Sequence, residues 1–181
     1  SFQTCLLILG IAFIYGSANS FDMAVIADFF RLHSADLPIL FKVGVILLLS
    51  AFAFKVAAFP FHFWAPDVYE GAPTPVAGFL STASKAAGFA VLLRLFFVAF
   101  SGFAVSWTTV LAILAAITMT VGNLLALPQT NIKRLLAFSS VAHAGYAMIG
   151  VIAFTQLGAA SVVFYLAAYI ATNLLAFGIV M

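Results

Sequence analysis

Long apolar stretches separated by short polar connections dominate the chain. A search for roughly 20 consecutive apolar residues, enough to cross about 30 Å of hydrocarbon, gives six candidate membrane-spanning helices. They run over residues 2–16, 38–64, 75–100, 104–127, 132–154 and 157–181. The pattern predicts an all-α fold, a polytopic transmembrane bundle that forms one domain over residues 1–181.

The segment between the first two predicted spans is the most polar part of the chain. Residues 17–36 contain five ionisable side chains, Asp22, Asp28, Arg31, His33 and Asp36. We expect a solvated loop with one short surface helix. The other connections are brief, and short connections favour antiparallel neighbours in a compact bundle.

Composition narrows the class of protein further. Hydrophobic residues make up 66% of the 181 residues and charged residues 7%, which excludes a water-soluble domain because too little polar surface would be available. The formal net charge of +2 gives no reason to expect a nucleic-acid partner. Cys5 is the only cysteine, so a disulfide framework is excluded. The apolar sequence at both ends suggests a segment of a longer membrane protein.

Lys85 is an ionisable residue in the middle of an apolar span. It lies about ten residues into the third predicted helix, roughly 15 Å deep at 1.5 Å per residue. Such a residue costs at least ~2.5 kcal/mol to insert and is a functional candidate that faces protein or water. Four small or polar residues share its helical face, Gly78, Ser81, Thr82 and Gly88. The alternative is a permanent ion pair that only joins helices, and its carboxylate would have to lie outside all six spans.

A second lysine lies beside a predicted helix break. Lys55 precedes Pro60 by five residues in the second span. Proline has no N–H and its ring clashes with the carbonyl four residues back, so we expect Pro60 to cost the hydrogen bond to Val56 and the helix to kink or break beside Lys55. A break inside a membrane is tolerated next to protein or a wet cavity. The alternative is a lysine near the helix end that reaches the interface.

These residues suggest proton chemistry. Burial disfavours the charged form of a lysine, and a second lysine nearby disfavours it further, which makes Lys55 and Lys85 candidate proton carriers. His143, in the middle of the fifth span, is either a proton relay or a neutral histidine bonded to a neighbouring carbonyl. Since His33 and His62 lie outside the span interiors, no two-histidine metal or haem site is expected.

Two runs of sequence resemble a known family. The first, residues 54–94, reads FKVAAFPFHFWAPDVYEGAPTPVAGFLSTASKAAGFAVLLR, and the second, residues 122–150, reads GNLLALPQTNIKRLLAFSSVAHAGYAMIG. Both are similar to signatures of the antiporter-like membrane subunits of proton-pumping NADH:quinone oxidoreductase, respiratory complex I. The sequence PDVYEGAP, residues 66–73, and the lysine in TASK, residues 82–85, resemble the subunit N branch of that family.

The resemblance implies a fourteen-helix fold of which this chain would supply helices six to eleven. It implies that Lys55 and Lys85 carry protons and that His143 belongs to the tenth-helix motif. Lys133, in the family's KR pair with Arg134, is a candidate proton entry. The fifth-helix glutamate and the twelfth-helix charge that the family uses would lie outside residues 1–181.

The resemblance also implies a proton-translocating subunit of the respiratory chain. Its setting would be the bacterial inner (plasma) membrane, or alternatively the thylakoid membrane, together with the other membrane subunits of the complex and the sister antiporter-like subunits. No cofactor or metal is expected in this chain, because FMN, iron–sulfur clusters and quinone would lie in partner subunits. A subunit of a multisubunit cation/proton antiporter or membrane-bound hydrogenase is the main alternative, and a structural scaffold is a third.

Overall fold

The computed structural model describes residues 2–33, 36–100 and 104–181, and every regular element within these ranges is a helix. The α-helices are α1 (Phe2–Ala18), α2 (Met23–Leu32), α3 (Ile39–Val56), α4 (Trp64–Gly71), α5 (Thr74–Phe79), α6 (Lys85–Arg94), α7 (Ala104–Ala126), α8 (Ile132–Ile152) and α9 (Gln156–Val180). Two π-helical turns, η1 (Leu80–Ser84) and η2 (Leu95–Ala99), continue α5 and α6.

Five of the described helical segments are long and apolar enough to cross a membrane. One of them is continuous from α5 to η2, over Thr74–Ala99. A sixth span results if α1 and α2, which are bent by 59° at their junction, are counted together. The predicted all-α polytopic bundle of about six spans is therefore confirmed. The expected short helix in the polar segment is α2. Asp22 Oδ1 caps it by accepting a hydrogen bond from Ala24 N at 2.8 Å. Residues 34–35 of that segment lie outside the described residues.

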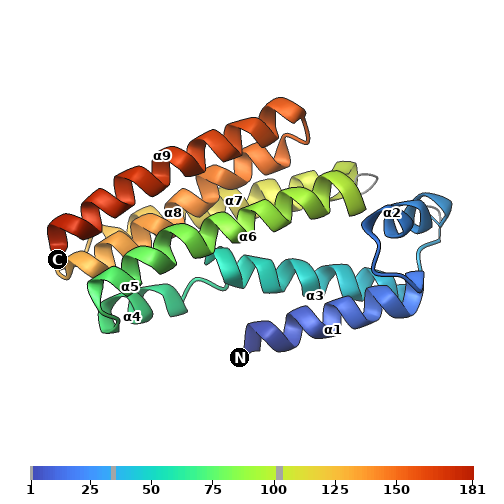
Figure 1. Cartoon of the computed structure of the whole chain (residues 1–181), viewed down its shortest axis with the longest axis horizontal. Helices are drawn as coiled ribbons and strands as arrows, with labels where there is room; N and C mark the ends of the chain where they lie inside the picture. Colours follow the sequence, from blue (N-terminus) through green and yellow to red (C-terminus); the bar gives the residue numbers. More distant parts are fainter. Residues whose placement is uncertain (1, 34–35, 101–103) are drawn as a thin grey trace.

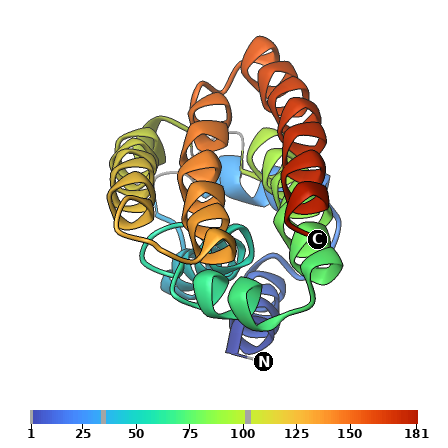
Figure 2. The same ribbon diagram turned by 90° about the vertical axis from the view of Figure 1, so that its left-hand side faces the viewer.

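The helices lie roughly side by side along the longest axis (Figure 1). In the end-on view α7, α8 and α9 follow one another in one layer, and α3 and α1 lie below them (Figure 2). One end of the bundle carries α4, the start of α5 and the C-terminus, and α2 lies at the opposite end. The middle of α8 is thus surrounded by other helices.

Glycines bring neighbouring helices into close contact. A methyl group added at Gly10 of α1 would lie 2.9 Å from Leu48 N of α3, and one added at Gly122 of α7 would lie 2.5 Å from Ala142 N of α8. Small residues allow such approaches, and van der Waals packing between close backbones is a main source of helix association in lipid. Larger side chains at these two positions would push α1 from α3 and α7 from α8.

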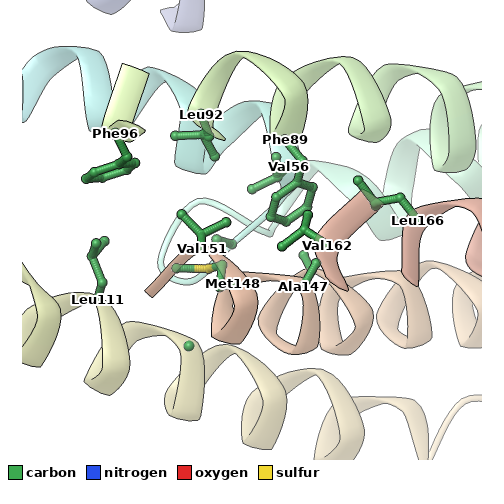
Figure 3. Packing of buried hydrophobic residues seen from close by; sticks show 13 residues of the cluster. Val56, Phe89, Leu92, Phe96, Leu111, Ala147, Met148, Val151, Val162 and Leu166 are labelled. Atoms are coloured by element: carbon green, nitrogen blue, oxygen red, sulfur yellow. The ribbon is translucent and has the colours of Figure 1, made fainter. Parts of the chain in front are cut away.

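A central apolar cluster fills the space between α3, α6, α7, α8 and α9 (Figure 3). Phe89 of α6 is fully buried and lies against Val162 and Leu166 of α9, while Met148 and Val151 come from α8. Val56, the last residue of α3, belongs to the same cluster. The end of α3 is therefore anchored in the core and does not reach the bundle surface.

The break after α3 lies beside Lys55, as expected, but the helix ends well before residue 64. The helix ends at Val56, and Ala57 adopts a left-handed conformation with φ 59° and ψ 40°. Ala57 N donates to Phe54 O at 3.1 Å and Ala58 N donates to Ala53 O at 2.8 Å, the hydrogen-bond pair of a Schellman C-terminus. The chain has therefore left the helix three residues before Pro60, and the expected span to residue 64 consists of α3 and the non-helical residues 57–63, after which α4 begins.

Neighbouring side chains satisfy the backbone that the break exposes. Phe59 N donates to Thr118 Oγ1 of α7 at 3.1 Å, and the same hydroxyl donates to Leu114 O at 2.6 Å. On the other side, Trp64 Nε1 donates to Phe54 O at 2.9 Å. A non-helical segment at membrane depth needs such partners, because hydrocarbon offers none.

Candidate functional site

Lys85 is buried at the junction of η1 and α6. It is the twelfth residue of the span that begins at Thr74, which places it roughly 17 Å along that helix. Its side chain is 2% exposed. Lys85 Nζ donates to both oxygens of Ser140 on α8, to Oγ at 2.7 Å and to the backbone carbonyl. Both partners are neutral oxygens. Within the described residues, Lys85 therefore does not join two helices through an ion pair. We call this pair of residues the Lys85 seat.

The residues before Lys85 shape the helix around it. Its four face-sharing neighbours are all buried, as the spacing predicts: Gly78, Ser81, Thr82 and Gly88. Ser81 Oγ and Thr82 Oγ1 donate to Gly78 O at 3.2 and 2.8 Å, at the start of the π-helical turn. Such wide turns inside α-helices are frequent at functional sites. Here the turn ends directly before the lysine.

His143 lies one turn beyond Ser140 on α8. Its Nδ1 shares a hydrogen bond of 2.5 Å with the Tyr165 hydroxyl of α9, and its ring lies 4.9 Å from that of Tyr169. The partner is thus a hydroxyl, where the sequence left open a neighbouring carbonyl. A small space, which we call the inner cavity, is lined by Lys85, Phe89, His143, Ala144, Tyr165, Leu166 and Tyr169. The structure therefore brings Lys85 and His143 to one site.

Lys55 approaches the same helix from the side of the break. It lies in the last turn of α3 and is half-buried. A methyl group added at Gly88 would lie 3.3 Å from Lys55 Cγ, so the lysine chain crosses α6 one turn beyond Lys85. Within the described residues its Nζ makes no hydrogen bond or ion pair. Lys55 is near the site without being fixed in it.

The connector between α3 and α4 holds two further candidates. Pro60 is exposed, whereas His62 is 1% exposed and neither of its ring nitrogens has a hydrogen-bond partner among the described residues. The His62 ring lies between those of Phe59 and Phe63, at 5.8 and 4.2 Å. His33 is exposed, with Nδ1 2.9 Å from Phe29 O. In the part of the chain that the structure describes, no three His, Cys, Asp or Glu side chains group to hold a metal ion.

Lys133 joins the start of α8 to the end of α4. Its Nζ donates to Glu70 O and to Ala72 O, each at 3.0 Å. These carbonyls belong to the C-terminal turn of α4, where free carbonyls and the helix dipole favour a cation. The predicted proton-entry residue is therefore also a link between two helices.

Acidic side chains of α4 complete this link. Arg134 Nη1 contacts Glu70 Oε2 at 2.7 Å and Asp67 Oδ1 at 2.8 Å. Asn131, whose Oδ1 caps α8 by accepting from Lys133 N, donates from Nδ2 to Glu70 Oε1 at 3.0 Å. We call Asp67, Glu70, Asn131, Lys133 and Arg134 the α4–α8 clamp. It holds the second half of the broken helix against α8.

The clamp and the seat connect the two sequence runs that carried the resemblance, and comparison with known proteins identifies the family. A family profile described as "NADH:quinone oxidoreductase/Mrp antiporter, TM" matches residues 1–181. The chain belongs to this family. It is 46% identical over 178 residues to NADH-quinone oxidoreductase subunit N of Desulforamulus reducens, covering 98% of this chain and 37% of that protein. Subunit N of Trichlorobacter lovleyi is also 46% identical, over 180 residues, with 99% of this chain and 37% of that protein covered.

Solved structures agree with the family. A chain of respiratory complex I from Thermus thermophilus with bound aureothin superposes with a TM-score of 0.77 at 37% identity, covering 98% of this chain and 37% of that one. A chain of the Mrp complex from Dietzia sp. gives 0.84 at 26% identity, covering 94% and 31%. This chain therefore spans about a third of the length of the proteins it resembles.

Sequence reasoning missed three parts of the site. It named no partner for Lys85, which the structure shows to be Ser140, and it gave no role to Tyr165. It also left the acidic residues of α4 in a loop, although Asp67 and Glu70 at helical spacing, and a KR pair after a capping asparagine, were visible. The sequence of one helix does not show that the acidic residues of α4 contact the basic pair of α8.

Proposed function

We propose that the protein to which this chain belongs translocates protons across a membrane as a subunit of NADH:quinone oxidoreductase, respiratory complex I. The observation that carries the proposal is the Lys85 seat, an ammonium group in the middle of a span with neutral oxygen partners and His143 beside it. An ionisable group at that depth is costly unless it has a function. Relatives named NADH-quinone oxidoreductase subunit N support the enzyme class.

The seat suits both protonation states of Lys85. When the lysine is charged, Ser140 Oγ and the Ser140 carbonyl accept its hydrogen bonds. When it is neutral, the serine hydroxyl can rotate and donate to the lone pair on Nζ, since a hydroxyl is both donor and acceptor. Releasing the proton therefore leaves neither partner unsatisfied. A carboxylate partner would instead be left as an unpaired buried charge.

Lys55 supplies the second proton position in this mechanism. Its chain lies against Gly88, one turn from Lys85, so a charge on one lysine raises the cost of charging the other in a low-dielectric interior. The non-helical residues 57–63 follow Lys55 directly and are the proposed place where water enters. Protons would thus arrive at the break and pass toward the seat, His143 and the remaining helices of the full-length protein.

The proposed setting follows from the relatives. We place the protein in the inner (plasma) membrane of a bacterium, because the organisms of the relatives named above are bacteria. Its partners there would be the other membrane subunits of the complex. FMN, iron–sulfur clusters and quinone would be bound by partner subunits, and this chain would contribute proton movement alone.

Lysine-to-methionine variants of the full-length protein test the proposal. Lys85→Met and Lys55→Met are measured in the assembled complex in proteoliposomes, recording NADH oxidation and proton uptake together. We expect Lys85→Met to lower proton pumping by about a hundredfold, the low end for loss of a positioned acid–base group. Lys42→Met, at an exposed position near the start of α3, is the control and should pump normally. Near-normal pumping by assembled Lys85→Met would remove Lys85 from the pathway.

A cation/proton antiporter subunit is the second candidate. The likeness to the Mrp complex, and to the membrane-bound sulfane sulfur reductase with a TM-score of 0.80 at 28% identity, favours a fold shared with such transporters. The two functions differ in their driving force. Proton uptake that follows a sodium gradient without NADH would favour the antiporter. Unchanged transport with both lysines replaced would favour a structural scaffold.

A further inference from the structure

Tyr165 separates two cavities of different character. The inner cavity contains Lys85 and His143. A second space of about 400 Å³, which we call the outer cavity, lies between α8 and α9 near their connection and is lined by Tyr146, Ala147, Ile149, Gly150, Ala153, Thr155, Leu157, Gly158, Ser161, Val162 and Tyr165. Tyr165 is common to both linings. Its side chain is half-buried and marks the position at which the two spaces meet.

The inner cavity has no room for water, although ionisable side chains are part of its lining. Its free volume is too small to hold a water molecule. Nevertheless Lys85 and His143 belong to its lining, and the buried hydroxyl of Tyr169 makes no hydrogen bond among the described residues. Polar groups in such a space normally acquire partners or water. The cavity therefore fits a site that is closed in this conformation and wetted in another.

The outer cavity lies toward the end of the bundle opposite the clamp. Thr155, in the short connection between α8 and α9, belongs to its lining, whereas the clamp lies at the first turn of α8. Tyr146, 37% exposed, lies at its side and accepts a hydrogen bond from Asn123 Nδ2 at 2.9 Å. A close crossing bounds the cavity, since a methyl group added at Gly150 would lie 2.9 Å from Gly158 O. This cavity is large and open enough for water.

We infer that Tyr165 is the gate between the Lys85–His143 site and the outer cavity. With its hydroxyl bonded to His143 Nδ1 the gate is closed and the inner cavity is dry. Rotation of the side chain into the outer cavity, which has the space for it, joins the two cavities and admits water to the lysine. Both the hydroxyl and the imidazole can donate and accept, so their hydrogen bond can re-form after each opening whether or not His143 Nδ1 carries a proton. The inference rests on the proposed proton transport and gives the transport its access route.

A thiol placed inside the inner cavity tests the gate independently of pumping. Ala144→Cys lies in the lining, is 2% exposed, and is made in a Cys5→Ser background of the full-length protein in the assembled complex. The probe is 2-aminoethyl methanethiosulfonate, and modification of this subunit is followed by mass spectrometry. We expect slow labelling with Tyr165 present and labelling at least about tenfold faster with Tyr165→Ala, because reaction follows the open population.

Two companion variants make the outcome decisive. Leu166→Ala enlarges the inner cavity without touching the outer one, so it should leave labelling slow. Tyr165→Phe keeps the ring and removes the hydrogen bond to His143 that holds the gate closed, so labelling should be faster than with Tyr165 and slower than with Tyr165→Ala. Equal labelling rates for Tyr165→Ala and Leu166→Ala would overturn the gate. If labelling responds to Tyr165→Ala but Lys85→Met pumps normally, the gate stands and the proposed function fails.

Discussion

Lys85 and Lys133 make the same kind of contact in two different surroundings. Each donates from Nζ to backbone carbonyl oxygen of a neighbouring helix. Around Lys133 lies a clamp that contains full opposite charges, with Arg134 between two carboxylates at the end of the bundle. Around Lys85 lie neutral oxygens in the bundle interior. The clamp suits permanent charge, because removing one partner leaves others unpaired, whereas the seat suits a charge that comes and goes.

The two regions are coupled through the helices that carry them. The clamp holds α8 at residues 131–134, two turns before Ser140. It also holds Ala72, just before the span that carries Lys85. Each half of the seat is therefore attached to one side of the clamp. A rigid clamp keeps Lys85 Nζ and Ser140 Oγ in contact while protons move.

Ser140→Ala changes the neutral surroundings of Lys85. Of the Ser140, Lys133 and Glu70 variants, we expect it to have the largest effect on proton pumping. It removes one of two acceptors for a buried ammonium group and leaves the backbone carbonyl in place. An unmade buried hydrogen bond costs about 1–3 kcal/mol, which corresponds to roughly a 5- to 150-fold change in rate. We expect pumping to fall by that factor in a normally assembled complex, measured as proton uptake per NADH oxidised. Ser139→Ala, at the adjacent position, is the control; equal effects of the two would show that the hydroxyl of Ser140 has no special role.

Lys133 variants separate the clamp from proton entry. Arginine keeps a positive charge and several donors but does not release its proton, whereas glutamine keeps neither charge nor the same reach. If Lys133 acts through the clamp, Lys133→Arg pumps nearly normally, and Lys133→Gln lowers the amount of assembled subunit roughly two- to fivefold. Proton pumping and subunit amount on native gels are measured together. Loss of pumping in a fully assembled Lys133→Arg complex would instead support proton entry at this residue.

The sequence predicted the spans and the depth of Lys85 because apolar runs and helical spacing are local properties. The four small or polar residues around Lys85 are buried as their spacing of three and four residues requires. The end of α3 was misplaced, because proline is a visible stop signal and a left-handed Ala57 is not. Glycine or asparagine is the residue that usually marks such an end.

The hydrogen-bond partners of the site residues could be identified only from the three-dimensional structure. Lys85 and Ser140 are 55 positions apart in the chain, and Arg134 and Asp67 are 67 apart. Two apolar helices pack in many registers with similar polar faces, so the faces predict contact with protein but not with a particular residue. His62 shows the same limit, since its burial depends on how residues 57–63 fold against α7.

Neutralising the clamp carboxylates should have the smallest effect of these variants. Its dependence on salt distinguishes the solvent-exposed clamp from the buried seat. Glu70→Gln removes a charge that contacts both Arg134 and Asn131, whereas Asp67→Asn removes one that contacts Arg134 alone and is 74% exposed. We expect a small fall in the thermal unfolding temperature of the complex, greater for Glu70→Gln than for Asp67→Asn, because exposed ion pairs contribute little. The difference from wild type should shrink in about 0.5 M salt, where screening acts over a few ångströms. The effect of Ser140→Ala on pumping should not change with salt, because the seat is buried. A fall in unfolding temperature with Glu70→Gln that does not depend on salt would mean that the clamp, too, is shielded from solvent in the full complex.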